Sequence, residues 1–206
     1  MLWRVFGVCG ASASGKTTLL KALVAEFSSR GMAVGVVKHH GHPDALELPE
    51  GMRAKDSHQL FAAGARCAAV SFRGGVWMEA RDEDLPEIVA RYMGWADVVL
   101  LEGFKGAPVK KIEVVAPGKE PIVAPGKGVV ALAVRGGGGQ REGIRVLDAS
   151  RVKDVADFII RELEKQSLPR VIVNGRPLEG LQGLWIARVL AATLGESPER
   201  IEVASG

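Results

Sequence analysis

Residues 10–18 read GASASGKTT and contain the side chains with the clearest chemical role in the sequence. They satisfy the pattern G-x-x-x-x-G-K-[ST], which is typical of a phosphate-binding loop, or P-loop. Successive backbone N–H groups of such a loop point inward at a di- or triphosphate. Lys16 would add a positive charge at the β and γ phosphates, and the Thr17 hydroxyl would bind Mg2+. The residues assigned to nucleotide binding are Gly10, Ala11, Ser12, Ala13, Ser14, Gly15, Lys16, Thr17 and Thr18.

The segments on both sides of this loop have the character that a P-loop requires. Residues 3–8 read WRVFGV and predict a short strand. Residues 17–30 predict a helix that ends near Gly31, because apolar side chains recur on one face. These side chains are Leu19, Leu20, Leu23, Val24 and Phe27. The amino end of the helix would then direct its partial positive charge at the phosphates.

Strands and helices alternate along the rest of the chain. Strands are predicted over residues 33–37, 68–72, 76–80, 97–101, 112–115, 129–134 and 144–147, and helices over 55–65, 84–93 and 152–163. The turn sequence at residues 73–76 predicts that the second and third of these strands form a hairpin. The pattern indicates a three-layer α/β P-loop NTPase fold with a mainly parallel sheet. Glycine-rich loops at residues 116–128 and 135–143 are expected on the surface.

The composition favours one large globular domain. The chain has 206 residues, of which 47% are hydrophobic and 25% are charged. A net charge of +3 without long basic runs argues against a nucleic-acid partner. The apolar runs are shorter than the roughly 18 residues that a membrane span needs, and a first strand starting near residue 3 leaves no room for a signal peptide. We expect a cytoplasmic protein in which Cys9 and Cys67 are buried thiols and form no disulfide.

The composition changes after residue 166, and we predict a P-loop domain over residues 1–166 and a small extension over residues 167–206. Residues 167–169 read as a linker. They are followed by a predicted strand, an Asn-Gly turn at residues 174–175, a second strand, a helix near residues 181–194 and a last strand at 201–203. About forty residues are marginal for a free-standing domain, so we expect this ββα(β) segment to pack on the main body or on a second subunit.

The position of each carboxylate relative to its strand decides which one is the candidate metal ligand. Ligands of open α/β sheets bind beyond the carboxyl ends of the strands. Asp97 begins the strand VVLL and Glu102 follows it, which separates them by about 13–17 Å. We therefore predict that Glu102, with Thr17, lies near Mg2+ and is a catalytic residue.

All four histidines fall between residues 39 and 58. His39, His40 and His42 follow the second predicted strand, on the side where a ligand would bind. With Asp44 they could hold zinc or nickel, but the segment has no firm ligand spacing. A contact to phosphate or to a partner and a plain solvated loop remain the alternatives.

Two further charged residues also have more than one interpretation. Asp56 opens a predicted helix, where an acidic side chain is favoured by the helix dipole. Alternatively, Asp56 positions water or belongs to the magnesium shell, which would make it catalytic. Lys105, in the run EGFK, could reach a ligand anion or be a solvated lysine.

Five runs of sequence together carry a specific resemblance. They are GASASGKTTL, VKHH, AKDSH with AAGA, DVVLLEGFK and KIEVV, within about residues 3–165. In this order they resemble the molybdopterin-guanine dinucleotide biosynthesis protein B family of GTP-binding adaptors. Matched by position, the resemblance places phosphates and magnesium at Gly10, Gly15, Lys16 and Thr17, acidic partners at Asp56 and Glu102, and further ligand-side loop positions at Lys38, His39 and Lys105.

The resemblance also implies a function. It implies GTP binding with weak hydrolysis, a homodimer, and assistance in attaching a guanine nucleotide to molybdopterin during molybdenum cofactor biosynthesis. It implies contact with the molybdopterin-guanine nucleotidyltransferase that performs the transfer and with other molybdenum cofactor proteins. The sequence has no N-K-x-D or T-K-x-D box, so the choice of guanine rests on the resemblance alone.

Two other functions remain open. One is a P-loop kinase of a small metabolite, whose lid could be the glycine-rich loop with Arg135 and Arg141. The other is a metallochaperone GTPase that uses the histidines. For the adaptor we expect slow basal turnover, and a dimer formed through the strand regions at residues 109–115 or 76–80, because an unpaired strand edge invites another strand.

Overall fold

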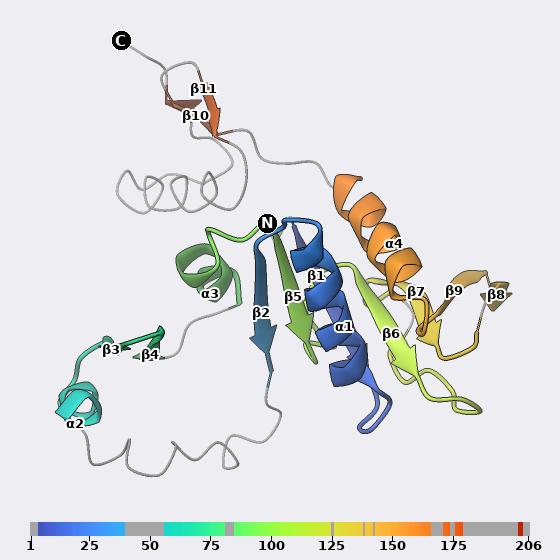
Figure 1. The fold of residues 1–206 in the computed structure, drawn as a ribbon, viewed down its shortest axis with the longest axis horizontal. Helices are drawn as coiled ribbons and strands as arrows, with labels where there is room; N and C mark the ends of the chain where they lie inside the picture. Colours follow the sequence, from blue (N-terminus) through green and yellow to red (C-terminus); the bar gives the residue numbers. More distant parts are fainter. Residues whose placement is uncertain are drawn as a thin grey trace. The chain divides into compact units, whose positions relative to one another are not determined.

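The computed structural model describes residues 4–39, 56–80, 85–124, 126–137, 139–141, 143–165, 171–173, 176–178 and 202–203. The chain divides into two units, Met1–His39 with Val89–Gly206 and His40–Ile88 (Figure 1). The first unit contains a sheet in the order β2-β5-β1-β6-β7-β9-β8. Its strands are β1 (Val5–Gly10), β2 (Val34–Lys38), β5 (Val98–Glu102), β6 (Lys111–Val115), β7 (Val129–Val134), β8 (Gly139–Arg141) and β9 (Ile144–Asp148). The first six strands in this order are parallel and β8 is antiparallel to β9, which confirms the predicted α/β P-loop fold.

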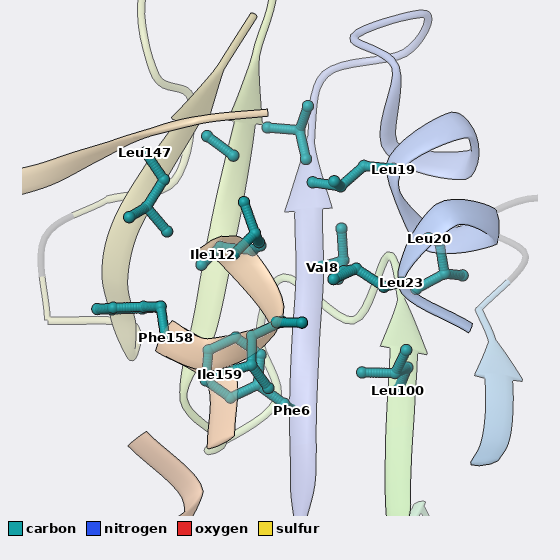
Figure 2. Packing of buried hydrophobic residues seen from close by; sticks show 14 of the residues in the cluster. Phe6, Val8, Leu19, Leu20, Leu23, Leu100, Ile112, Leu147, Phe158 and Ile159 are labelled. Carbon is teal, nitrogen blue, oxygen red and sulfur yellow. The ribbon is translucent and has the colours of Figure 1, made fainter. Parts of the chain in front are cut away.

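The core lies between the sheet and two helices, α1 (Lys16–Ser29) and α4 (Val152–Glu164). Strands β1 and β5 are buried along their whole length, as expected for near-continuous apolar runs in a parallel sheet. Helix α1 packs an apolar stripe against β1 and β5, and helix α4 packs one against β1 and β9 (Figure 2). The residues labelled there are Phe6, Val8, Leu19, Leu20, Leu23, Leu100, Ile112, Leu147, Phe158 and Ile159.

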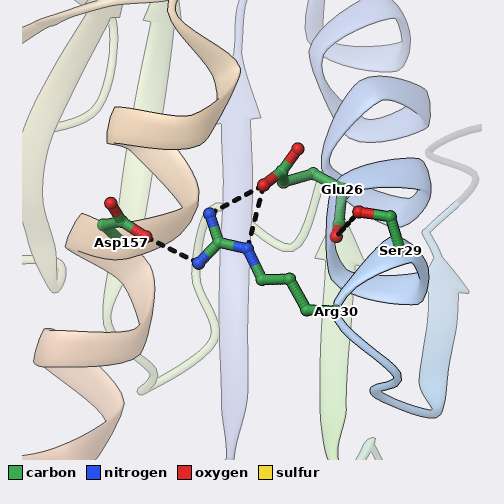
Figure 3. Close-up of polar contacts among 4 residues, drawn as sticks. All are labelled: Glu26, Ser29, Arg30 and Asp157. Atoms are coloured by element: carbon green, nitrogen blue, oxygen red, sulfur yellow. Dashed lines mark hydrogen bonds and ion pairs between the residues drawn. The ribbon is translucent and has the colours of Figure 1, made fainter.

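Arg30 links the carboxyl end of α1 to α4 (Figure 3). Its Nη1 lies 2.6 Å from Oδ1 of Asp157, and its Nε and Nη2 lie 2.9 and 2.8 Å from Oε1 of Glu26. Hydrogen bonds to Asp157 and then Glu26 raise the pKa of Arg30. The three residues connect the two helices, and α1 is the helix that begins at the P-loop.

Two charged residues are buried on strand β6. Lys111 is completely buried, and its Nζ donates to the backbone carbonyls of Lys105, Ala107 and Lys127 at 3.0, 2.6 and 2.7 Å. Glu113 is 1% exposed, and its carboxylate accepts N–H groups from residues 122–123. The backbone groups thus satisfy two charges that would otherwise be costly to bury, and each side chain ties loop residues to the sheet.

The second unit contains α2 (Asp56–Ala62) and the hairpin β3 (Cys67–Phe72) and β4 (Gly75–Ala80). The hairpin is antiparallel and confirms the predicted one. Nδ1 of His58 lies 3.2 Å from both carboxylate oxygens of Glu79, which joins α2 to β4. Helix α3 (Leu85–Tyr92) crosses the boundary between the two units.

The C-terminal residues form a separate small sheet of β10 (Val171–Val173), β11 (Arg176–Leu178) and β12 (Glu202–Val203). Strand β10 pairs antiparallel with β11 and parallel with β12. The predicted linker, Asn-Gly turn and helix at 181–194 lie outside the described residues, and the boundary at residue 166 remains a prediction. Among the helices that the structure describes, none combines the length and the apolar character of a membrane span.

Several sequence-based expectations were wrong in detail. The first strand runs from Val5 to Gly10, so the first P-loop glycine is also the last strand residue. The second glycine-rich loop contains strand β8, because its residues find open hydrogen-bonding groups on β9. Cys67 is exposed on the hairpin, whereas Cys9 is buried, and both thiols are free.

The expected dimer contact through residues 109–115 assumed an unpaired strand edge there, and this assumption was wrong. Strand β6 pairs with β1 on one side and with β7 on the other. A central strand has no free edge to offer a second subunit. The alternative region, β4, is paired with β3 within the described part of the chain, and Val76 and Met78 on it are exposed.

Glu162 leads to a prediction about acid stability. Burial opposes its ionisation, but hydrogen bonds from Lys165 and Lys110 outweigh burial and lower the pKa of this carboxyl. The unfolded chain therefore binds more protons near pH 4, so the stability contributed by Glu162 is present above its ordinary pKa and is lost as pH falls through the lowered one. Urea unfolding between pH 6 and pH 3 should show a smaller loss of stability for Glu162→Gln than for the unaltered protein. Glu164→Gln, an exposed change on the same helix, should follow the unaltered protein, and an unchanged pH profile in Glu162→Gln would contradict the assignment.

Candidate functional site

The candidate site lies where β2, β5 and β1 end together. The strand register pairs Lys38 with Glu102 and pairs Glu102 with Val8, so the last residues of β2 and β5 are neighbours. Strand β1 continues two residues beyond Val8 to Gly10 and enters the P-loop. This is the carboxyl edge of the parallel sheet, where ligands of such folds bind.

The backbone of the P-loop turns sharply and then enters helix α1. Gly10 and Gly15 have φ angles of +139° and +94°, and Ala13 between them has φ of +56°. Gly15 is the N-cap residue of α1 and supplies no capping side chain, and the first turn has no acidic residue. The first N–H groups of α1 and its positive end are therefore suited to an anion.

Two side chains of the loop, Lys16 and Ser14, could contact a bound anion. Nζ of Lys16 donates to the carbonyl of Ala11, so the side chain folds back over its own loop. Oγ of Ser14 is buried and has no hydrogen-bond partner in the described part of the chain. A buried hydroxyl without a partner is costly, and a ligand oxygen would relieve that cost.

Glu102 connects the loop helix to two strands. Oγ1 of Thr17 donates to Oε1 of Glu102 at 2.7 Å, and Nζ of Lys38 lies 3.5 Å from the same oxygen. The side chain of Glu102 is 9% exposed, whereas that of Lys38 is 57% exposed. The sequence analysis placed Thr17 and Glu102 together from strand ends, and the structure brings them into direct contact.

Residues 38–39 and residues 102–104 lie side by side at this edge. The N–H of His39 donates to the carbonyl of Glu102 at 2.9 Å, and the N–H of Gly103 donates to Val8 at 3.1 Å. The rings of His39 and Phe104 lie 5.1 Å apart between centroids. The sequence analysis did not select Phe104, although its place directly after the Glu102 strand end was a usable signal.

Asp97, the rejected carboxylate, lies at the opposite end of β5. Its Oδ2 accepts the N–H of Ala33 at 2.8 Å, and its Oδ1 lies 3.8 Å from Nη1 of Arg4. These contacts hold the amino ends of β2, β5 and β1 together. Asp97 thus has a structural position away from the P-loop.

The structure describes the other predicted site residues only in part. Lys105 is exposed, and its carbonyl is one of the three that Lys111 holds. Asp56 begins α2 in the second unit, and its side chain is outside the described residues. His40, His42 and Asp44 also lie outside them, and the described residues contain no group of three metal-binding side chains.

Cys9 directly precedes the P-loop, and its thiol is expected to be unreactive. Its Sγ donates to the carbonyl of Ile112 at 3.4 Å. Burial, reinforced by the charge of Glu113, raises the pKa of the thiol to about 11. A protonated, buried thiol is neither a good nucleophile nor a good metal ligand at neutral pH.

The topology weakens the kinase alternative. The proposed lid loop leads into β8, which lies four strand positions from β1 in the order β1-β6-β7-β9-β8. At about 4.8 Å per strand, this corresponds to roughly 19 Å. Arg135 follows β7, two positions from β1, so neither part of the loop adjoins the P-loop through the sheet.

Comparison with known proteins gives consistent results. Residues 5–135 match a family model described as Molybdopterin guanine dinucleotide synthesis protein B. The chain is 32% identical over 166 residues to the molybdopterin-guanine dinucleotide biosynthesis adapter protein of Escherichia coli (strain K12), covering 76% of this chain and 91% of the relative. It is 30% identical over 164 residues to the adapter protein of the same name from Haemophilus influenzae, covering 75% and 86%. The crystal structure of Bacillus subtilis MobB matches with a TM-score of 0.60 at 27% identity, covering 79% of this chain and 99% of that one.

The two loop glycines should differ in their tolerance of a side chain. A Cβ on Gly10 would lie 2.3 Å from the carbonyl oxygen of Val114, whereas a Cβ on Gly15 would have nothing within 4 Å. Gly10→Ala should therefore lower the free energy of unfolding by ~1–3 kcal/mol from overpacking, in addition to the ~1–2 kcal/mol of backbone strain that Gly15→Ala also incurs. Urea unfolding of both variants tests the order. Equal stability of the two variants would mean that β1 does not approach β6 as described.

Proposed function

The chain belongs to the molybdopterin guanine dinucleotide synthesis protein B family, and we propose that it is a GTP-binding adapter in the formation of molybdopterin-guanine dinucleotide. In this role the bound state of the P-loop would govern contact with the molybdopterin-guanine nucleotidyltransferase and other molybdenum cofactor proteins. The name of the Escherichia coli relative supports the adapter role.

One observation carries the nucleotide proposal. The P-loop joins β1 to an uncapped helix N-terminus, and the Thr17 hydroxyl at that terminus bonds to the buried Glu102 of the neighbouring strand. Backbone N–H groups would bind the phosphates, and Lys16 would move from the carbonyl of Ala11 to the β and γ phosphates. The flexible four-carbon stem of Lys16 makes such a movement inexpensive.

The residues also fit Mg2+. A hydroxyl and a carboxylate are hard oxygen donors, and Mg2+ commonly takes one or two protein oxygens together with phosphate oxygens and water. Thr17 and Glu102 would supply the protein oxygens. When bound, the cation would neutralise phosphate charge and polarise the bond to the terminal phosphate. The buried, partnerless Oγ of Ser14 would gain an acceptor in the phosphate group.

We further propose that basal hydrolysis is slow. Lys16 and Lys38 bring positive charge to the site. In P-loop NTPases the charge that develops on the terminal phosphate is often met by an arginine supplied from a partner. Activation by a partner subunit or by the transferase suits an adapter better than rapid turnover alone. A homodimer is part of this proposal, and the exposed hairpin β3–β4 is the region left for it after β6 is excluded.

A nucleotide titration with Lys16→Ala tests the proposed function. GTP and ATP are titrated separately by calorimetry in the presence of Mg2+, and GTP should bind more tightly. A charged hydrogen bond contributes ~1.5–3 kcal/mol, so Lys16→Ala should weaken GTP binding roughly 10–150-fold without loss of fold. Lys21→Met, at an exposed lysine further along α1, is the matched control and should leave the affinity unchanged. Unchanged GTP affinity in Lys16→Ala would overturn the P-loop assignment.

A second pair of variants tests the choice between the two carboxylates of β5. Glu102→Gln removes the charge beside Thr17 and should reduce Mg2+-dependent GTP hydrolysis more than GTP binding, because the phosphate contacts of the loop persist. Asp97→Asn should leave the turnover of the folded protein equal to that of the unaltered protein. It should lower the stability, because it weakens the contacts of Asp97 with Ala33 and Arg4. Single-turnover hydrolysis and thermal unfolding distinguish these effects. Loss of turnover in Asp97→Asn with normal turnover in Glu102→Gln would reverse the assignment.

A further inference from the structure

Lys38 is placed to compete for the atom that the proposed magnesium site needs. It is the last residue of β2, and the register sets it directly beside Glu102, the last residue of β5. Its Nζ lies 3.5 Å from Oε1 of Glu102. The same oxygen accepts the 2.7 Å hydrogen bond from Thr17. Hydroxyl, ammonium and any cation bound at this point therefore share one carboxylate oxygen.

The two partners of this ion pair differ strongly in their surroundings. Glu102 is 9% exposed and lies at the end of a strand that is buried throughout. A buried carboxylate needs a counter-charge, and its removal from water makes that need greater. Lys38 is 57% exposed on a flexible four-carbon stem. The lysine can leave at little cost, whereas the carboxylate cannot.

We propose that Lys38 is a displaceable counter-ion of Glu102, which occupies the carboxylate until a divalent cation takes its place. A divalent cation bound to Glu102 and Thr17 would repel a neighbouring ammonium, so the two cannot both occupy Oε1. Binding of the metal then releases the Lys38 charge at the carboxyl edge, where the nearest new anion is the phosphate chain in the P-loop. This inference rests on the proposed nucleotide function.

The proposal predicts that Lys38 lowers the affinity for the metal. Mn2+ serves as the probe, titrated by electron paramagnetic resonance into protein saturated with GDP, which lacks the terminal phosphate. Lys38→Met should bind Mn2+ roughly 1.5- to 5-fold more tightly, the range expected for a partly exposed ion pair. Lys38→Arg keeps the charge and should behave as the unaltered protein, and Lys21→Met controls for the loss of one lysine charge elsewhere.

A double-mutant cycle separates competition for Glu102 from general repulsion of the metal. In a Glu102→Gln background, Lys38→Met should have no further effect on Mn2+ affinity. Equal or weaker Mn2+ binding in Lys38→Met, or the same gain in the Glu102→Gln background, would overturn the inference and leave the nucleotide site standing. Failure of the unaltered protein to bind GDP at all would overturn the proposed function and this inference with it. Circular dichroism of each variant verifies that the fold is retained.

Discussion

The close approach of β1 to β6 at Gly10 is the constraint on which the site depends. A Cβ at this position would lie 2.3 Å from the carbonyl of Val114 and 3.0 Å from Oγ of Ser14. With glycine there, β1 keeps its pairing to β6 as far as its last residue and then turns at once into the P-loop. The loop therefore starts from a rigid strand, and helix α1 begins beside the end of β5. The contact between Thr17 and Glu102 follows from this geometry.

The buried charges on β6 hold the connecting loops before and after this strand. The chain leaves the carboxyl end of β5 at Glu102 and must return to the amino end of β6 at Lys111. Lys111 binds three backbone carbonyls from two loops, at Lys105, Ala107 and Lys127, although burial lowers its pKa. Glu113 accepts N–H groups of residues 122–123 in the second of these loops, between β6 and β7. Because each charge is satisfied by backbone groups, the loops before and after β6 are tied to the sheet.

Much of the fold and part of the site were predictable from local sequence. The P-loop pattern, apolar strands and helix stripes follow from residue type and periodicity, and the strand-end rule placed Glu102 at the edge reached by Thr17. Strand β8 was missed because its pairing is supplied by β9 and its own residues are poor strand formers. The burial of Lys111 and Glu113 was also not predictable, because a charged residue reads as exposed until the carbonyls and amides that satisfy it are known. The exposure of Cys67 depends on the same kind of non-local information.

Two cations at the candidate site have partners within the chain. Lys16 is bonded to its own loop and Lys38 to Glu102, so each charge has a partner within the chain. Binding of a nucleotide with its metal would exchange these contacts for new ones, and the net gain is the difference between the two sets. Such a site can be specific for the charged ligand without being very tight. In the proposed site a metal would release the Lys38 contact and phosphate would release the Lys16 contact. Nucleotide and metal would then each lower the cost of binding the other, and that coupling would give an adapter a bound state distinct from its free state.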